Sequence, residues 1–97
     1  MLINPTTDEV RVEVEIQKSH KDSSFRAVGS LTNPIVFEIP AVPIPDVNND
    51  ADWSPITYGG VDFALNSDNS LLTVNGALGA VRLHKPAGDN VGVDWKW

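Results

Sequence analysis

The sequence predicts an all-β protein, a single-domain antiparallel β-sandwich of about seven to eight short strands with a jelly-roll or Ig-like arrangement. Three observations predict this fold class. Several segments alternate apolar and polar residues, as half-buried strands do. Turn-forming residues recur at about eight- to twelve-residue intervals, which is the spacing of short strands in a sandwich. No segment keeps a helical period for more than a few residues, and a length of 97 residues fits one domain, residues 1–97.

The cleanest strand signal spans residues 9–18, where apolar and polar residues alternate without interruption. A period of two places one set of side chains on the core face and the other in solvent. We expect the core face to carry Val10, Val12, Val14 and Ile16, and the solvent face to carry Glu9, Arg11, Glu13, Glu15 and Gln17. Residues 25–31 and 35–39 predict the next two strands, separated by the turn signal Asn33-Pro34.

A proline-rich segment interrupts this pattern near residues 40–47. Its three prolines lack the amide hydrogen that a central strand needs, and they hold the chain extended. The apolar side chains of Val42 and Ile44 lie between these prolines and need cover. Two interpretations stay open: the segment drapes over its own sheet as a crossover connection, or it lies as an arm on a neighbouring subunit.

The remaining strands are separated by turn sequences rich in glycine, asparagine and aspartate. They are expected at residues 53–58, 61–65, 70–74, 80–85 and 91–97. The alternation predicts that Val61, Phe63 and Leu65 point inward, and that Val81, Leu83 and Lys85 lie opposite Arg82 and His84, with these last two on the solvent face.

The last strand places Val91, Val93, Trp95 and Trp97 on one face. Large aromatic surface at this end of the chain must be buried in its own core or against another molecule. Packing within the sandwich is favoured for Trp95 and an intersubunit contact for Trp97. The residues expected to contribute to an interface are therefore Trp95, Trp97 and Val93, together with Val42 and Ile44 of the proline-rich segment.

Composition excludes several classes of function. The chain has no cysteine, which rules out disulfides and thiolate metal sites. Its formal net charge is −6 and its basic residues do not cluster, so we expect no nucleic-acid partner. No apolar run is long enough to cross a membrane. The first residues lack the basic and apolar regions of a secretory signal, so we expect maturation in the cytoplasm.

The acidic loop at residues 46–52 resembles the first half of a calcium-binding EF-hand or dockerin loop. Asp46, Asn48, Asp50 and Asp52 place oxygen ligands at alternate positions. The sixth position lacks the glycine that makes the sharp turn, and the twelfth lacks an acidic ligand. We therefore favour a solvated acidic turn and expect neither a metal nor another cofactor.

No residue set identifies a reaction, so we expect no enzymatic activity. His20 lies in a polar turn and His84 in a strand, and neither belongs to a nucleophile motif. Glu13 and Glu15 share a strand face beside other polar residues, which is typical of solvated surface rather than of paired catalytic carboxylates.

Two aromatic residues in the middle of the chain are candidates for sugar binding. Trp53 and Tyr58 follow the acidic loop, and aromatic planes can stack on the apolar faces of sugar rings. Trp53 equally fits a plug in the core.

The last third of the chain resembles small structural proteins of tailed bacteriophages. The resemblance runs from Asn69 to Gly88, with a strand, a glycine turn and the pattern x-Arg-x-x-Lys-Pro, followed by Val91-Gly92-Val93. It implies a β-sandwich or jelly-roll subunit of a virion, such as a head decoration (cement) protein or a fibre domain, often trimeric. It carries over no catalytic residues.

We therefore expect a non-enzymatic virion structural protein, a capsid decoration subunit that binds the outer surface of a phage head. Its expected partners are further copies of itself, with a trimer favoured, and a capsid or other virion protein. The alternative is a carbohydrate-binding or receptor-adhesion module of a tail fibre or a similar assembly.

Overall fold

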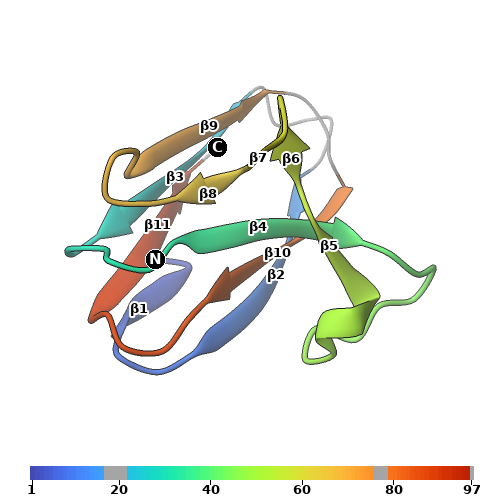
Figure 1. Cartoon of the computed structure of the whole chain (residues 1–97), viewed down its shortest axis with the longest axis horizontal. Helices are drawn as coiled ribbons and strands as arrows, with labels where there is room; N and C mark the ends of the chain where they lie inside the picture. Colours follow the sequence, from blue (N-terminus) through green and yellow to red (C-terminus); the bar gives the residue numbers. More distant parts are fainter. Residues whose placement is uncertain (17–21, 76–78, 97) are drawn as a thin grey trace.

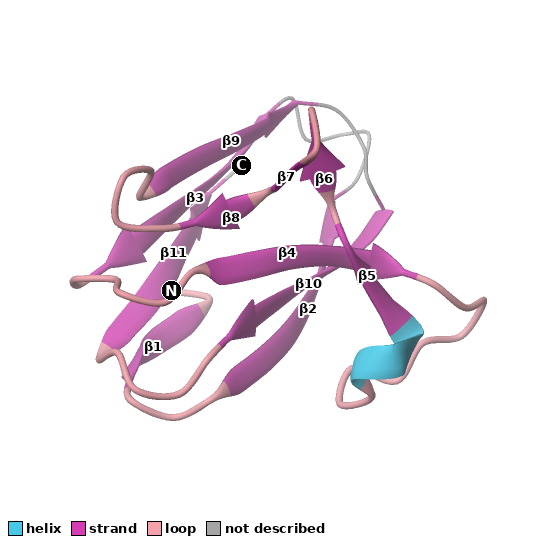
Figure 2. Cartoon of the chain, in the orientation of Figure 1, coloured by secondary structure: helices cyan, strands magenta, loops and turns pink. Residues whose placement is uncertain are grey.

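A computed structural model of the chain describes residues 1–16, 22–75 and 79–96. Within these residues the protein is nearly all β, with two antiparallel sheets packed face to face and a single short 3-10 turn (Figures 1 and 2). This confirms the predicted all-β sandwich. No helix among the described residues is long and apolar enough to cross a membrane.

The strands follow one another along the chain with short connections, except between β4 and β8, where a long insertion holds three further strands. The elements are β1 (Ile3–Thr6), β2 (Val10–Ile16), β3 (Asp22–Val28), β4 (Ile35–Pro40), the 3-10 turn η1 (Asp50–Asp52), β5 (Trp53–Pro55), β6 (Thr57–Tyr58), β7 (Val61–Asp62), β8 (Ala64–Leu65), β9 (Leu71–Asn75), β10 (Gly79–Lys85) and β11 (Val91–Lys96).

The order of the strands is that of a jelly roll. One sheet runs β1-β11-β3-β9; the other runs β2-β10-β4-β5, with β8 also paired to β4. The first strand pairs with the last, β2 with β10, β3 with β9 and β4 with β8, all antiparallel. This is a long hairpin of four strand pairs rolled into two sheets, the jelly-roll plan rather than the Ig plan.

The core lies between the two sheets and is built from the alternate positions of each strand. Phe25 of β3 and Phe37 of β4 connect the sheets through an edge-to-face ring contact, with centroids 4.9 Å apart. The buried apolar side chains around them are Ile3, Val14, Ile16, Leu31, Ile35, Leu65, Leu72, Val74, Val81, Leu83, Val91 and Val93. The predicted core face of residues 9–18 is confirmed, with Val14 and Ile16 fully buried and Val10 and Val12 half-buried.

One glycine is required by close packing of the backbone. The register between β1 and β11 shifts between Ile3 and Thr6, so β1 bulges over β11 at Gly92. A Cβ atom added at Gly92 would lie 2.8 Å from the backbone nitrogen of Pro5 and closer still to the carbonyl oxygen of Ile3. Glycine therefore lets the first strand lie directly on the last one.

The loops at one end of the sandwich are tied to each other. Asp89, in the loop between β10 and β11, accepts hydrogen bonds from the hydroxyl and amide of Thr32 and from the amide of Asn33. These bonds lower the pKa of the Asp89 carboxyl, the Thr32 hydroxyl contributing most. The buried Lys85 donates to the carbonyl oxygens of Asp8 and Pro86. These contacts fix the ends of the strands that the loops join.

The structure corrects several sequence-based expectations about the strands. The strand predicted at residues 25–31 is β3 and lies three residues earlier, and the strand predicted at residues 53–58 is divided into β5 and β6. Val61 does not point inward: it is 69% exposed, because β7 belongs to a separate hairpin with β6 and not to either large sheet.

Candidate functional site

The candidate site is an exposed apolar segment between β4 and η1, residues 41–45, which we call the arm (Figures 1 and 2). No strand includes these residues, as their prolines predict. Ile44 is 90% exposed and Val42 is 37% exposed. The chain's own sheet therefore leaves Ile44 uncovered, whereas it covers much of Val42.

Both ends of the arm are held by Asp52. The amide of Ala41 donates to the backbone carbonyl of Asp52 at 2.8 Å. The amide of Asp46 donates to the Asp52 carboxylate at 2.9 Å. The arm is therefore a loop closed at its base, and the two prolines within it limit the conformations it can adopt.

The acidic loop that follows is folded by its own side chains. The Asp46 carboxylate accepts from the amide of Asn48, and the Asn49 side chain accepts from the amide of Ala51, which caps η1. The indole nitrogen of Trp53 donates to the Asp46 carbonyl at 2.9 Å. These bonds give the loop one shape and attach it to β5.

Arg82 of β10 attaches this loop to the sheet, and its side chain is fully buried. Its guanidinium donates two hydrogen bonds to Glu38 of β4, at 2.6 and 2.9 Å. A third nitrogen donates to the carbonyl of Val47 and to the Asp50 carboxylate. The guanidinium lies 5.5 Å from the ring centroid of Trp53, a cation–π distance.

A second arginine strengthens this attachment. Arg11 of β2 donates two hydrogen bonds to the Asp50 carboxylate and one to Glu9. The hydrogen bonds from Arg11 and then from Arg82 hold the pKa of the Asp50 carboxyl well below its usual range. His84 forms a 2.9 Å hydrogen bond with Glu9, and this bond and the contact with Arg11 lower the pKa of Glu9.

The burial of Arg82 differs from the sequence-based prediction, in which Arg82 and His84 lie on the solvent face. The side chain does lie on the outer face of β10, but the acidic loop and Trp53 cover it, and His84 beside it is half-buried. The sequence does contain a signal for this burial: an arginine lies within an apolar strand, and the chain also carries a tight cluster of acidic residues. Such a residue needs a buried counter-charge.

The loop residues weighed as calcium ligands have other partners. Asp50 is bound by two arginines, and the carboxylates of Asp46 and Asp52 accept from backbone amides, that of Asp46 from the amide of Asn48. In the described part of the chain, no three acidic or histidine side chains are grouped as a metal ion requires.

Of the two aromatic residues proposed for sugar binding, only Trp53 has a side chain that the structure describes. Trp53 is only 4% exposed, so its ring is not available to stack on a sugar. It is buried against Arg82 on the outer face of the second sheet and not in the core between the two sheets. The backbone of Tyr58 forms part of β6, and its side chain lies outside the part that the structure describes.

The end of the chain contributes to the core. Val93, expected at an interface, is fully buried within its own chain and is unavailable to a partner. Trp95 is half-buried and stacks on Phe25 with ring centroids 5.8 Å apart. Trp97 and His20 lie outside the described residues. Glu13 and Glu15 lie exposed on β2.

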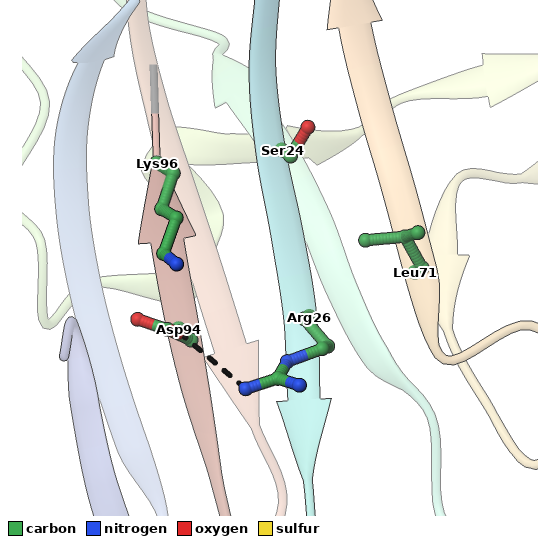
Figure 3. A pocket seen from close by; sticks show the side chains of 5 residues that line it. All are labelled: Ser24, Arg26, Leu71, Asp94 and Lys96. Atoms are coloured by element: carbon green, nitrogen blue, oxygen red, sulfur yellow. Dashed lines mark ion pairs between the residues drawn. The ribbon is translucent and has the colours of Figure 1, made fainter.

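The outer face of the other sheet carries a shallow hollow of about 230 Å³ (Figure 3). Its lining residues come from three adjacent strands: Ser24 and Arg26 of β3, Leu71 of β9, and Asp94 and Lys96 of β11. Arg26 and Asp94 face each other across the strands, with a single ion-pair distance of 3.6 Å. The hollow is smaller than the roughly 300–1,000 Å³ of pockets for drug-sized ligands, and none of its lining residues is aromatic.

Comparison with protein-family models, curated proteins and solved structures found no match to this chain.

Proposed function

We propose that this protein is a non-enzymatic structural subunit of a virion, which decorates the outer surface of a phage head and attaches through the arm. Its partners are a capsid or other virion protein and further copies of itself, with a trimer favoured. The observation that carries the proposal is the exposure of Ile44 on a loop whose base is fixed by Asp52.

An exposed isoleucine on a constrained loop is suited to binding. Burying such a side chain contributes about 1.5–3 kcal/mol, and the prolines reduce the entropy that ordering the loop would cost. The buried arginine beneath the loop keeps the arm at one place on the surface. Several arms on an oligomer would bind a repeating lattice with increased avidity.

The fold supports the proposal by analogy only. The jelly roll is common among viral capsid proteins, and it is also found in lectins and enzymes. The charge of −6 favours a basic partner surface and keeps the protein dissolved at high concentration.

The test is cosedimentation with phage heads assembled from the capsid gene of the same genome, with and without the purified protein. We expect the wild-type chain to sediment with the heads at a fixed ratio to the capsid subunit. Ile44→Asp places a charge at the centre of the arm, and we expect it to weaken binding about tenfold or more, because one isoleucine side chain would no longer be buried.

Val61→Asp is the matched control, because Val61 is also an exposed apolar residue but lies on the β6–β7 hairpin outside the arm. We expect this variant to bind the heads like the wild type. Equal binding by Ile44→Asp and the wild type would contradict attachment through the arm. A monomer in light scattering that also fails to sediment with the heads would overturn the proposed function.

A further inference from the structure

The edge of the second sheet formed by β2 is open and regular. In the described part of the chain β2 pairs only with β10, in an unbroken register from Val10 to Ile16. An edge strand leaves alternate amide and carbonyl groups available to another strand. We propose that this edge binds an extended segment of a partner protein in which apolar and basic residues alternate.

The other edges suit this role less well. β1 contains Pro5 and a shift of register, and β5 has three residues and ends in Pro55. β9 has five residues and no charged side chain to select a partner. β2 has seven residues, with neither proline nor glycine. Natural sheets block such edges with prolines and bulges, and β2 has neither.

The two faces of β2 determine the chemistry of the added strand. On the core side, Val10 and Val12 are only half-buried, so apolar side chains of the added strand would cover them. On the outer side, Glu13 and Glu15 are exposed and have no hydrogen bond or ion pair with any described residue. Basic side chains beside these two carboxylates would form cross-strand ion pairs.

The charges also argue against a second copy of this chain at the same edge. The one basic residue of β2, Arg11, is already bound by Glu9 and Asp50. Antiparallel pairing of two β2 strands about Glu13 would bring the two Glu13 carboxylates together, which is destabilising. A basic segment instead places two of its charges opposite Glu13 and Glu15. Its remaining basic residue lies beside Arg11, whose charge Glu9 and Asp50 already balance.

The probe is a synthetic peptide of alternating lysine and valine, about eight residues long, which matches the length of β2. A peptide of the same composition with its lysines and valines in separate blocks is the control. We expect the alternating peptide to shift the amide resonances of residues 10–16 and to slow their hydrogen exchange. The block peptide leaves both unchanged.

Charge reversal then tests the role of the carboxylates. In Glu13→Lys/Glu15→Lys two attractive cross-strand pairs become repulsive, so we expect affinity for the alternating peptide to fall about tenfold. Asp62→Lys/Asp68→Lys changes the net charge equally at exposed sites on β7 and in the β8–β9 turn. Neither residue belongs to β2 or to its partner β10, so these changes remove no cross-strand pair with the peptide and should change affinity less than about twofold.

Three outcomes would overturn the inference. One is that the alternating peptide leaves the β2 amides unchanged. The second is that both double variants lose affinity equally, which indicates general attraction to an acidic protein. The third is that self-association of the protein slows hydrogen exchange of the β2 amides in the absence of peptide, which would assign the edge to a second copy of the chain. The Ile44→Asp variant should bind the peptide like the wild type, so failure of the arm proposal would not affect this result.

Discussion

At the scale of single residues, Arg82 connects parts of the chain that are distant in sequence. It joins β10 to Glu38 of β4 and to the loop at Val47 and Asp50. A buried guanidinium is destabilising unless its partners are in place, so the position of the loop and the Arg82–Glu38 ion pair depend on each other.

We expect Arg82→Met to lower the free energy of unfolding by about 3–5 kcal/mol, because the substitution leaves Glu38 buried without its counter-charge. In Arg82→Met/Glu38→Met both buried charges are gone, and we expect most of the lost stability to return. Urea denaturation followed by circular dichroism measures both variants.

The control for this prediction is a substitution of Arg26, the exposed arginine that lines the hollow on the other sheet. Arg26 is 62% exposed and its ion pair with Asp94 spans 3.6 Å, so Arg26→Ala should cost less than about 1 kcal/mol. Similar losses in Arg82→Met and Arg26→Ala would show that the buried network does not hold the loop.

At the scale of elements, the acidic loop depends on an ionised Asp50. In the folded protein its pKa lies below the usual range, because Arg11 and Arg82 donate hydrogen bonds to the carboxylate. In the unfolded chain the pKa of an aspartate is about 3.9. Between these two values the unfolded state binds more protons, so stability increases with pH there and is lost as the pH falls.

We therefore expect the stability of the wild type to fall more steeply than that of Asp50→Asn as the pH is lowered from about 5 to about 2. Asp50→Asn is less stable at neutral pH, and the difference between the two proteins should narrow in acid. Urea midpoints at a series of pH values measure this. The control is Asp68→Asn, a substitution in an exposed turn outside this network, and its stability should follow the wild-type dependence on pH. If the difference in stability between the wild type and Asp50→Asn stayed constant as the pH was lowered, the role of Asp50 would be contradicted.

Strands in which apolar and polar residues alternate over many positions could be predicted from the sequence. β2, β4, β10 and β11 lie where a period of two places them, because each has one face on the core. The short elements of the insertion could not be placed in this way. Two-residue strands such as β7 carry too few side chains to show a period, which is why Val61 was assigned to the wrong face.

The candidate site was predictable in part. Pro43 and Pro45 predict an extended segment outside the central strands, and the exposed Ile44 agrees with that prediction. Pro40, where the strand pattern was expected to break, is the last residue of β4. The burial of Arg82 and Trp53 depends on contacts with a loop distant in sequence from β10, and local periodicity contains no information about such contacts.

At the scale of the whole molecule, the jelly roll leaves two features available for assembly. The arm follows the end of β4, and β2 forms one edge of the same sheet (Figure 1). Both belong to the sheet that carries the arginine network, whereas the other sheet presents the polar hollow. A subunit of this kind could bind a lattice through the arm and an extended segment through β2.

The pairing of the first strand with the last also determines how the molecule folds. β1 meets β11 and β2 meets β10, so few native contacts are local, and closing such loops costs entropy before the contacts form. We expect refolding on a timescale of milliseconds to seconds, typical of two-state all-β domains. Stopped-flow tryptophan fluorescence measures the rate. The chain has three tryptophans, of which Trp53 lies in the insertion, so a Trp95→Phe/Trp97→Phe variant leaves Trp53 as the one emitting tryptophan and reports on the insertion alone. Equal refolding rates in this variant and the wild type would indicate that the insertion and the sandwich fold together, as we expect because the buried Arg82 network joins them. Refolding within microseconds would contradict the expectation from the non-local topology.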